Sequence, residues 1–218
     1  MTFEDIKKNP EVLAYYDKGN EILGFLGYTD HSPAHTTLVA ERTADILRSY
    51  GYGAYEIELA KIAGFMHDIG NVINRNHHAE YGALLANDIL KDTDLSISDR
   101  VKVVSAIANH DESTGVASDP ITAALIIADK TDVRRSRVRE KDSVLYDIHD
   151  RVNYAVTDTD LQLDPARKEI TLCLNIDETI CTMYEYFDIF LGRMMMCSRA
   201  ARVFDSKFSL KVNGQKIL

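Results

Sequence analysis

The residues best suited to chemistry lie in the heptapeptide FMHDIGN, which spans residues 65–71. A histidine and an aspartate stand side by side there, at the end of a segment, residues 57–65, that offers little polar surface. Both side chains are therefore expected to be buried, although a buried carboxylate costs many kcal/mol unless it is paired or binds a metal. This pair, His67 and Asp68, makes a metal centre a reasonable hypothesis.

Other polar residues interrupt apolar helical patterns in the same way. With the first pair they give six candidate ligands near the ends of successive predicted helices: His35, His67, Asp68, His78, His110 and Asp129. A single histidine on an apolar helix face is more often a hydrogen-bonded core residue than a ligand. A core role of this kind explains Asp129 less well, because Asp129 ends the segment ITAALIIAD, which is apolar on every side. Imidazole and carboxylate together suit Mn, Fe, Co, Ni or Zn, so a site for a divalent transition-metal ion is predicted.

Helices are expected to position these residues. Apolar residues recur at spacings of three and four over six segments: 9–26, 33–50, 55–69, 78–91, 98–110 and 119–135. Near residue 150 the pattern changes to alternation, which predicts short strands at 152–156, 170–176 and 208–212. The apolar stretch 178–203 has helical spacing and would cover one face of a small antiparallel sheet.

The sequence thus predicts a mostly α-helical chain in two parts. Residues 1–150 would form a helical metal-binding domain, and residues 151–218 a small α+β appendage with a short sheet and one long helix. Three short strands leave open edges, and strand edges are where chains pair. We therefore expect either a covered edge or a homodimer through the C-terminal region.

Composition narrows the class of protein. The 218 residues are 45% hydrophobic and 27% charged, and the formal net charge of -9 argues against broad binding to nucleic-acid phosphates. No run approaches the roughly 18 apolar residues of a membrane span. The acidic start, residues 1–5, is unlike a secretory leader, so we expect a cytoplasmic protein with no membrane partner. Cys173, Cys181 and Cys197 lack paired zinc-knuckle spacing and are expected to fill the core.

At these positions the sequence resembles the HD superfamily of metal-dependent phosphohydrolases. That family orders its ligands as a histidine, an adjacent histidine-aspartate pair, one or two further histidines and an aspartate. HDIG, NHDE and ADKTD occur in that order within residues 31–135, and the family is also helical. The resemblance implies that four residues hold a first metal ion: His35, His67, Asp68 and Asp129. His78 and His110 would hold a second ion, with Asp68 as the bridge.

The chemistry implied by this family is hydrolysis of phosphate esters, often those of nucleotides. Water is a poor nucleophile and anionic phosphoryl oxygens repel hydroxide, but a divalent metal lowers the pKa of bound water towards ~7 and neutralises phosphate charge. Two ions about 3.5 to 4 Å apart could also hold the nucleophile and bind a phosphoryl oxygen. Asp68 would then be the catalytic residue on which turnover depends most.

Two departures from the family narrow the expected substrate. Many members carry a lysine just after the HDIG stretch, close to the substrate phosphate, whereas this chain has Asn71. The branch that cleaves cyclic dinucleotides has two adjacent histidines and a glycine-tyrosine-proline signature, but residues 109–112 read NHDE with no such signature after them. We therefore expect less cationic help at the phosphate, no third metal and no cyclic dinucleotide substrate.

A charged segment at residues 129–140, DKTDVRRSRVRE, could add to the site. Lys130 and Arg134 are candidate substrate contacts, and Asp132 could orient a metal ligand from behind. On a continuous helix, however, Arg134 would lie about 140° from Asp129. Either the helix bends after Asp132, or the arginines face elsewhere and complement the dipole at the helix C-terminus.

Two further histidines are expected on the surface or in loops, namely His31 and His149. His31 could instead replace His35 as the first ligand, because it lies four residues before it.

We therefore predict a metal-dependent phosphohydrolase that cleaves a phosphate ester or anhydride of a small phosphorylated metabolite, with a nucleotide favoured. The alternative is a nucleotide-sensing module that binds metal without turnover, which the absence of the lysine makes credible. A di-iron oxygenase could use the same ligand set and would consume oxygen in the presence of iron.

Overall fold

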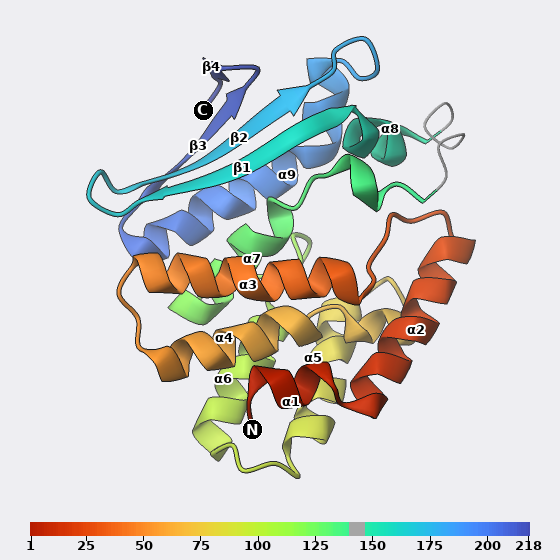
Figure 1. The fold of residues 1–218 in the computed structure, drawn as a ribbon, viewed down its shortest axis with the longest axis vertical. Coiled ribbons are helices and arrows are strands. Elements are labelled where there is room, and N and C mark those ends of the chain that lie inside the picture. Colours follow the sequence, from red (N-terminus) through yellow and green to blue (C-terminus); the bar gives the residue numbers. More distant parts are fainter. Residues whose placement is uncertain (140–146) are drawn as a thin grey trace.

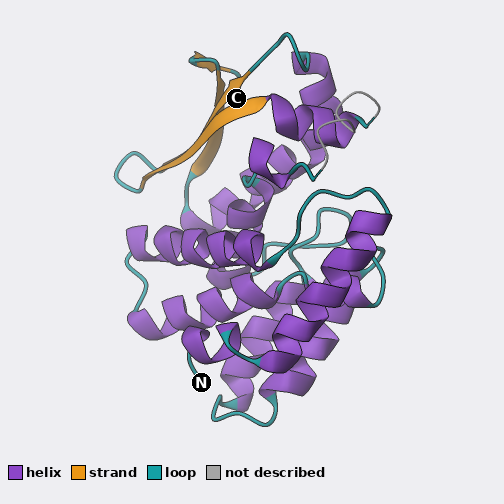
Figure 2. Cartoon of the chain, turned by 45° about the vertical axis from the view of Figure 1, so that its right-hand side comes forward, coloured by secondary structure: helices purple, strands orange, loops and turns teal. Residues whose placement is uncertain are grey.

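The computed structural model describes residues 1–139 and 147–218 (Figure 1). A bundle of helices forms the N-terminal part, and a sheet with one long helix forms the C-terminal part, as Figure 2 shows. The elements are α1 (Phe3–Lys7), α2 (Pro10–Phe25), α3 (Pro33–Ser49), α4 (Ala54–Met66), η1 (Ile69–Val72), α5 (His78–Leu90), α6 (Ile97–Ala108), α7 (Pro120–Lys130), η2 (Arg135–Arg137), α8 (Ile148–Ala155), β1 (Val156–Asp164), β2 (Glu169–Ile176), α9 (Met183–Ala201), η4 (Arg202–Phe204), β3 (Lys207–Val212) and β4 (Gln215–Lys216).

Capping residues set where several helices begin. Asn9, Ser32 and Asp119 accept hydrogen bonds from backbone amides in the first turns of α2, α3 and α7, and a proline follows each of them. Proline fits the first helical position because no helix amide bond is lost there. The first five predicted helices are confirmed within three residues at each end, and the predicted long helix at 178–203 is confirmed as α9.

The sixth predicted helix is shorter than expected. α7 ends at Lys130 rather than at residue 135, and the 3-10 turn η2 follows a short loop. The backbone carbonyl of Asp132 accepts a hydrogen bond from Arg137 Nη1 at 3.0 Å, where a continuing helix would supply a backbone amide. The chain therefore turns just after Lys130, which settles the alternative that the sequence left open.

The first predicted strand is mostly wrong. Residues 152–155 lie in α8, and β1 begins only at Val156. Asp147 caps this helix by accepting hydrogen bonds from the amides of His149 at 2.7 Å and Asp150 at 3.1 Å. Periodicity over so few residues cannot separate the last turn of a helix from the start of a strand, and the cap decides the outcome.

The C-terminal sheet is mixed, not antiparallel as predicted. Its strand order is β1-β2-β3-β4, and β1 pairs with β2, and β3 with β4, in antiparallel fashion. β2 and β3 run parallel. The reason is that α9 connects them, because a helical crossover returns the chain to the same end of the sheet. In Figure 1, α9 lies between the sheet and α7.

One cluster of buried apolar side chains runs from the helical bundle into the sheet. It includes Phe65 of α4, Ile126 of α7, Phe190 of α9 and Leu172 of β2. The mostly helical fold with a small C-terminal α+β region is therefore confirmed, while its division into two domains and its pairing as a dimer stay predictions. Across the described ranges, no helix is long and apolar enough to cross a bilayer.

The three cysteines follow the expectation in part. Cys181 and Cys197 are buried and Cys173 is half-buried, and all three are free thiols.

Gly70 forms the closest contact between η1 and α5. A Cβ atom at this position would lie 2.0 Å from the carbonyl oxygen of His78 and 2.4 Å from the amide nitrogen of Gly82. We therefore expect Gly70→Ala to push η1 away from α5 and to lower the free energy of unfolding by about 1 to 3 kcal/mol. Denaturant titration measures this change.

The matched control is Gly192→Ala in α9, where an added Cβ meets no atom within 4 Å. This substitution should stabilise the protein by up to ~1 kcal/mol, because alanine favours a helix over glycine. Equal stability of Gly70→Ala and the parent protein would contradict the close contact.

Candidate metal centre

The six predicted ligands meet at one place inside the helical bundle. They come from the ends of successive helices: His35 of α3, His67 and Asp68 after α4, His78 of α5, His110 after α6 and Asp129 of α7. All except Asp129 are buried, and the Asp129 side chain is only 12% exposed. The helical frame therefore turns six polar side chains inward at a common point.

Four of these side chains surround one position. His35 Nε2 lies 3.4 Å from Asp129 Oδ1 and 3.8 Å from Asp68 Oδ2. His67 Nε2 lies 3.3 Å from Asp68 Oδ2 and 3.6 Å from Asp129 Oδ1. Ligand atoms that each lie ~2.1 Å from a transition metal are roughly 3 to 3.5 Å from one another. These separations therefore fit one ion with little movement of the side chains.

A second group of donors lies beside the first. His78 Nε2 is 3.2 Å from His110 Nε2 and 3.5 Å from Asp68 Oδ1. His67, Asp68 and His110 also place one donor atom each within 4.8 Å of one another. Asp68 thus turns one carboxylate oxygen towards each group, as a bridging ligand would.

Hydrogen bonds fix the orientation of all four histidine rings. Each Nδ1 atom contacts an oxygen: the Asp132 carboxylate for His35 (2.7 Å), Gly64 O for His67 (2.8 Å), Arg75 O for His78 (3.1 Å) and Ile107 O for His110 (2.7 Å). A carbonyl or carboxylate oxygen can only accept, so each Nδ1 donates. A neutral ring then carries its lone pair on Nε2, which faces the centre.

These lone pairs have no suitable partner in the described chain. His35 Nε2 and His67 Nε2 are buried without a hydrogen bond to any described residue. His78 Nε2 faces His110 Nε2, and neither atom of a neutral pair can donate. Buried polar atoms are normally paired, and a divalent transition-metal ion in each donor group would satisfy these nitrogens. The donor set therefore fits a metal.

The buried charges also favour a cation at this place. Burial by itself disfavours protonation of His67, but the charges of Asp68 and Asp129 outweigh burial and raise the pKa of His67 to about 10. Burial lowers the pKa of His110 to about 3, and the neighbouring His67 and His78 act in the same direction. Positive charge is thus stabilised beside the two carboxylates, where a metal ion can replace a proton.

The three tentative residues of the charged segment occupy different places. The Asp132 carboxylate lies behind His35, and Lys130 Nζ lies 2.8 Å from Asp129 Oδ2. Arg134 donates to Asp132 from Nε at 2.5 Å and from Nη2 at 3.0 Å. It lines a separate surface hollow together with Arg42. The early end of α7 therefore places Arg134 apart from Lys130 and the metal centre.

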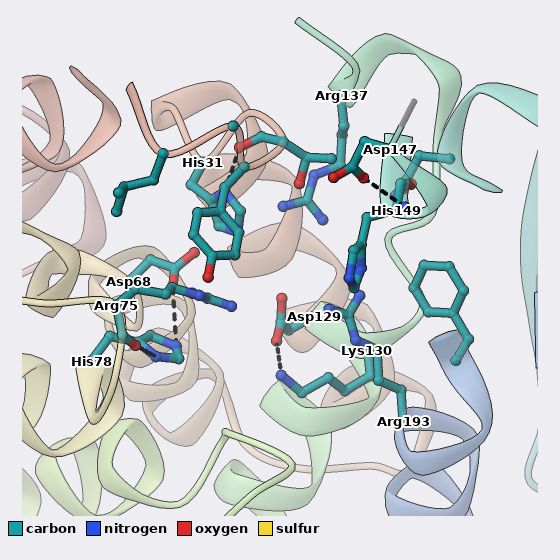
Figure 3. A pocket seen from close by; sticks show the side chains of 16 residues that line it. His31, Asp68, Arg75, His78, Asp129, Lys130, Arg137, Asp147, His149 and Arg193 are labelled. Atoms are coloured by element: carbon teal, nitrogen blue, oxygen red, sulfur yellow. Dashed lines mark hydrogen bonds and ion pairs between the residues drawn. The ribbon is translucent and has the colours of Figure 1, made fainter. Parts of the chain in front are cut away.

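A cavity of about 310 Å³ opens from the centre (Figure 3). Besides Asp68, His78, Asp129 and Lys130, its lining includes His31, which the sequence offered only as an alternative to His35. It also includes charged or polar residues that were not among the predicted site residues: Arg75, Arg137, Asp147, His149, Asn153 and Arg193. His31 lies in a loop, as one of the two expectations had it, but its side chain is buried rather than on the surface, and its ring lies 5.7 Å from that of His35. His149 is exposed, as predicted, but it also borders the cavity.

The C-terminal region forms part of this cavity. Phe190 and Arg193 of α9 line it, together with residues of α8. Arg193 Nε lies 3.1 Å from Glu112 Oε1, and the other oxygen of Glu112 lies 2.7 Å from Lys130 Nζ. These ion pairs connect α9 to the end of α7, next to the proposed ligand Asp129. Phe190 and Arg193 were not predicted to line the site, because they lie far from the histidine motif in sequence.

Comparison with known proteins agrees with this geometry. Residues 34–136 match the family model of the HD domain, and this segment contains all six candidate ligands. The chain therefore contains an HD domain over these residues, which confirms the resemblance. The cluster of buried histidines and aspartates within an HD domain is consistent with binding of a divalent metal.

A curated relative is similar over a longer segment. The "Uncharacterized protein MJ1020" of Methanocaldococcus jannaschii is 28% identical over 173 residues, which are 68% of this chain and 66% of that protein. The chain thus spans slightly less than two thirds of the length of this relative.

The second group of donors predicts the metal content. We expect metal-replete protein to hold about two ions per chain, and His110→Ala to hold about one, because it loses a ligand of the second position. Elemental analysis after dialysis measures both values. His77→Ala is the matched control, since the neighbouring His77 side chain is 66% exposed. A parent protein that holds one ion in excess Mn, Fe or Co would leave a mononuclear centre.

Proposed function

We propose that the protein is a metal-dependent phosphohydrolase that cleaves a phosphate ester or anhydride of a small phosphorylated metabolite, with a nucleotide as the favoured substrate. The observation that carries this proposal is that four Nε2 atoms and two carboxylates of the HD domain converge at one end of a cavity. Such domains are typical of metal-dependent phosphohydrolases.

The charges around the cavity support an anionic ligand. Four basic side chains line it: Arg75, Lys130, Arg137 and Arg193. Three acidic side chains line it as well: Asp68, Asp129 and Asp147. A divalent ion would add further positive charge, whereas the chain as a whole carries -9. Anion binding is thus favoured at this cavity over most of the protein surface.

The residues of the centre divide the work between them. A bound divalent ion would neutralise charge on the phosphoryl group and make an attacking water more acidic. Asp68 and Asp129 supply the negative charge that holds such an ion. Asp132 keeps Nδ1 of His35 protonated and the ring oriented. Because the carboxylates and rings are buried, bulk water is largely excluded, which strengthens each electrostatic interaction.

A nucleotide-sensing module without turnover is the second candidate. The observation that favours it is Asn71, which stands where many members of the family carry a lysine and whose side chain is buried against Asp68. An uncharged amide at this place brings no positive charge to a phosphate.

Multiple-turnover assays separate the two candidates. Inorganic phosphate should be released from at least one member of a panel of nucleotides and sugar phosphates. The release should stop with a chelator and return with Mn or Co. Binding of a nucleotide without release would identify the sensor, and iron-dependent oxygen consumption would identify an oxygenase.

Asp68→Asn should be the most damaging single substitution for turnover. The amide keeps the size and one oxygen but removes a negative charge that both donor groups share. We expect a fall in rate on the order of a thousandfold. Folding should suffer less, because an amide is easier to bury than a carboxylate. Steady-state kinetics and thermal denaturation measure the two effects.

Asp45→Asn serves as the control, because this carboxylate is 61% exposed on α3. Asp68→Asn protein with normal metal content and turnover within a few-fold of the parent would contradict this prediction. His67 and Asp68 would then have only a structural role at the helix end, and the metal centre would lie elsewhere.

A further inference from the structure

Arg75 lies between η1 and α5, at the border of the metal centre. Its side chain points into the cavity beside Asp68 and His78 (Figure 3). Nη1 of Arg75 lies 3.9 Å from Asp68 Oδ1. The backbone carbonyl of the same residue accepts the hydrogen bond from His78 Nδ1. Arg75 therefore touches both the proposed bridging carboxylate and a proposed ligand of the second ion.

The other basic residues of the cavity are held by partners in the protein. Lys130 Nζ lies 2.8 Å from Asp129 Oδ2 and 2.7 Å from Glu112 Oε2. Arg193 Nε lies 3.1 Å from Glu112 Oε1. Arg137 donates to two backbone carbonyls at 3.0 and 3.1 Å. Lys130 and Arg137 are thus held by two partners each, whereas Arg193 makes one hydrogen bond to a described residue, Glu112.

The guanidinium of Arg75 keeps most of its donors, and it lies directly beside the metal centre. Within residues 1–139 and 147–218 it donates one hydrogen bond, from Nη1 to Asn71 Oδ1 at 3.2 Å. Its central carbon lies 5.5 Å from the centroid of the Tyr28 ring, which supports it from one side. A guanidinium has five N–H donors in a planar fork that matches two oxygens of a phosphate. The remaining donors are thus available to a ligand.

Asn71 fixes this arginine relative to the metal centre. Its Nδ2 donates to the backbone oxygen and to Oδ1 of Asp68, both at 2.9 Å, while its Oδ1 accepts from Arg75. The side chain is buried, so this geometry is well defined. The residue that replaces the lysine of many family members therefore holds another cation, four residues further along the chain.

We propose that Arg75, positioned by Asn71, binds the terminal phosphoryl group of the substrate. This inference rests on the proposed function and narrows its substrate to phosphomonoesters and nucleotides with a terminal phosphate. A terminal phosphoryl group has three oxygens free of ester bonds, enough for the metal centre and the arginine fork together. A phosphodiester has only two. Arg75 thus supplies the cationic contact that the absence of the lysine had removed.

Calorimetric titration of inorganic phosphate into Mn-loaded protein tests the contact without turnover. We expect Arg75→Ala to weaken phosphate binding about tenfold or more, because a charged, two-point hydrogen bond is lost. Arg75→Lys should recover part of the affinity, since it keeps the charge but not the fork. Metal content should stay at the parent value in both variants. Arg167→Ala is the control, because its side chain is 82% exposed.

Steady-state kinetics on two model substrates test the preference for a phosphomonoester over a phosphodiester. Arg75→Ala should raise KM for p-nitrophenyl phosphate by about tenfold or more and change kcat less, and the preference over bis-p-nitrophenyl phosphate should shrink. Asn71→Ala should raise KM in the same direction by a smaller factor, because the arginine is then less well held.

The outcomes separate this inference from the proposed function. Phosphate affinity that is unchanged in Arg75→Ala overturns the inference even if the parent enzyme turns over substrate. Loss of metal from both Arg75 variants also overturns it, because the residue would then be structural. A parent protein that binds phosphate through Arg75 but hydrolyses no substrate supports the contact and refutes the phosphohydrolase.

Discussion

Burial of two carboxylates beside four imidazoles is the constraint on which the rest of the structure depends. Asp68 and Asp129 lose most of their contact with water, and such a loss is tolerated only where positive charge compensates it. Protons on neighbouring rings can compensate in part, and a divalent ion can do so more fully. The surrounding helices are largely apolar inside, and the candidate ligands stand at or near their ends. The metal centre therefore lies where several helices begin or end.

A line of ion pairs extends this constraint into the C-terminal region. Lys130 balances Asp129 and also meets Glu112, which in turn meets Arg193 of α9. Charge beside the centre is thus linked to a helix that the HD domain match does not include. The last part of the chain is therefore electrostatically part of the site.

Much of the site could be predicted from sequence because its residues break a regular pattern. Asp129 is conspicuous because the segment before it, residues 123–128, is entirely apolar, and a similar contrast marked the histidines. Arg75 lies in a polar loop without periodicity, so only the folded chain places it in the cavity. The early end of α7 was not predicted, because tertiary hydrogen bonds hold the residues that follow it, from His35 to the Asp132 carboxylate and from Arg42 to the Thr131 carbonyl. Parallel pairing of β2 and β3 likewise depends on the crossover through α9, which local alternation does not encode.

The position of α9 separates two properties along the chain. Every proposed metal ligand lies at or before Asp129, whereas Phe190 and Arg193 close one side of the cavity from the far end of the sequence. One segment of the chain therefore binds the metal ion, and another segment limits the size of the small molecule that the cavity can hold. A change in the sheet that tilts α9 would widen or narrow the cavity while leaving the metal ligands in place. Related chains could thus come to bind a different small molecule in the cavity through changes in the last quarter of the sequence alone.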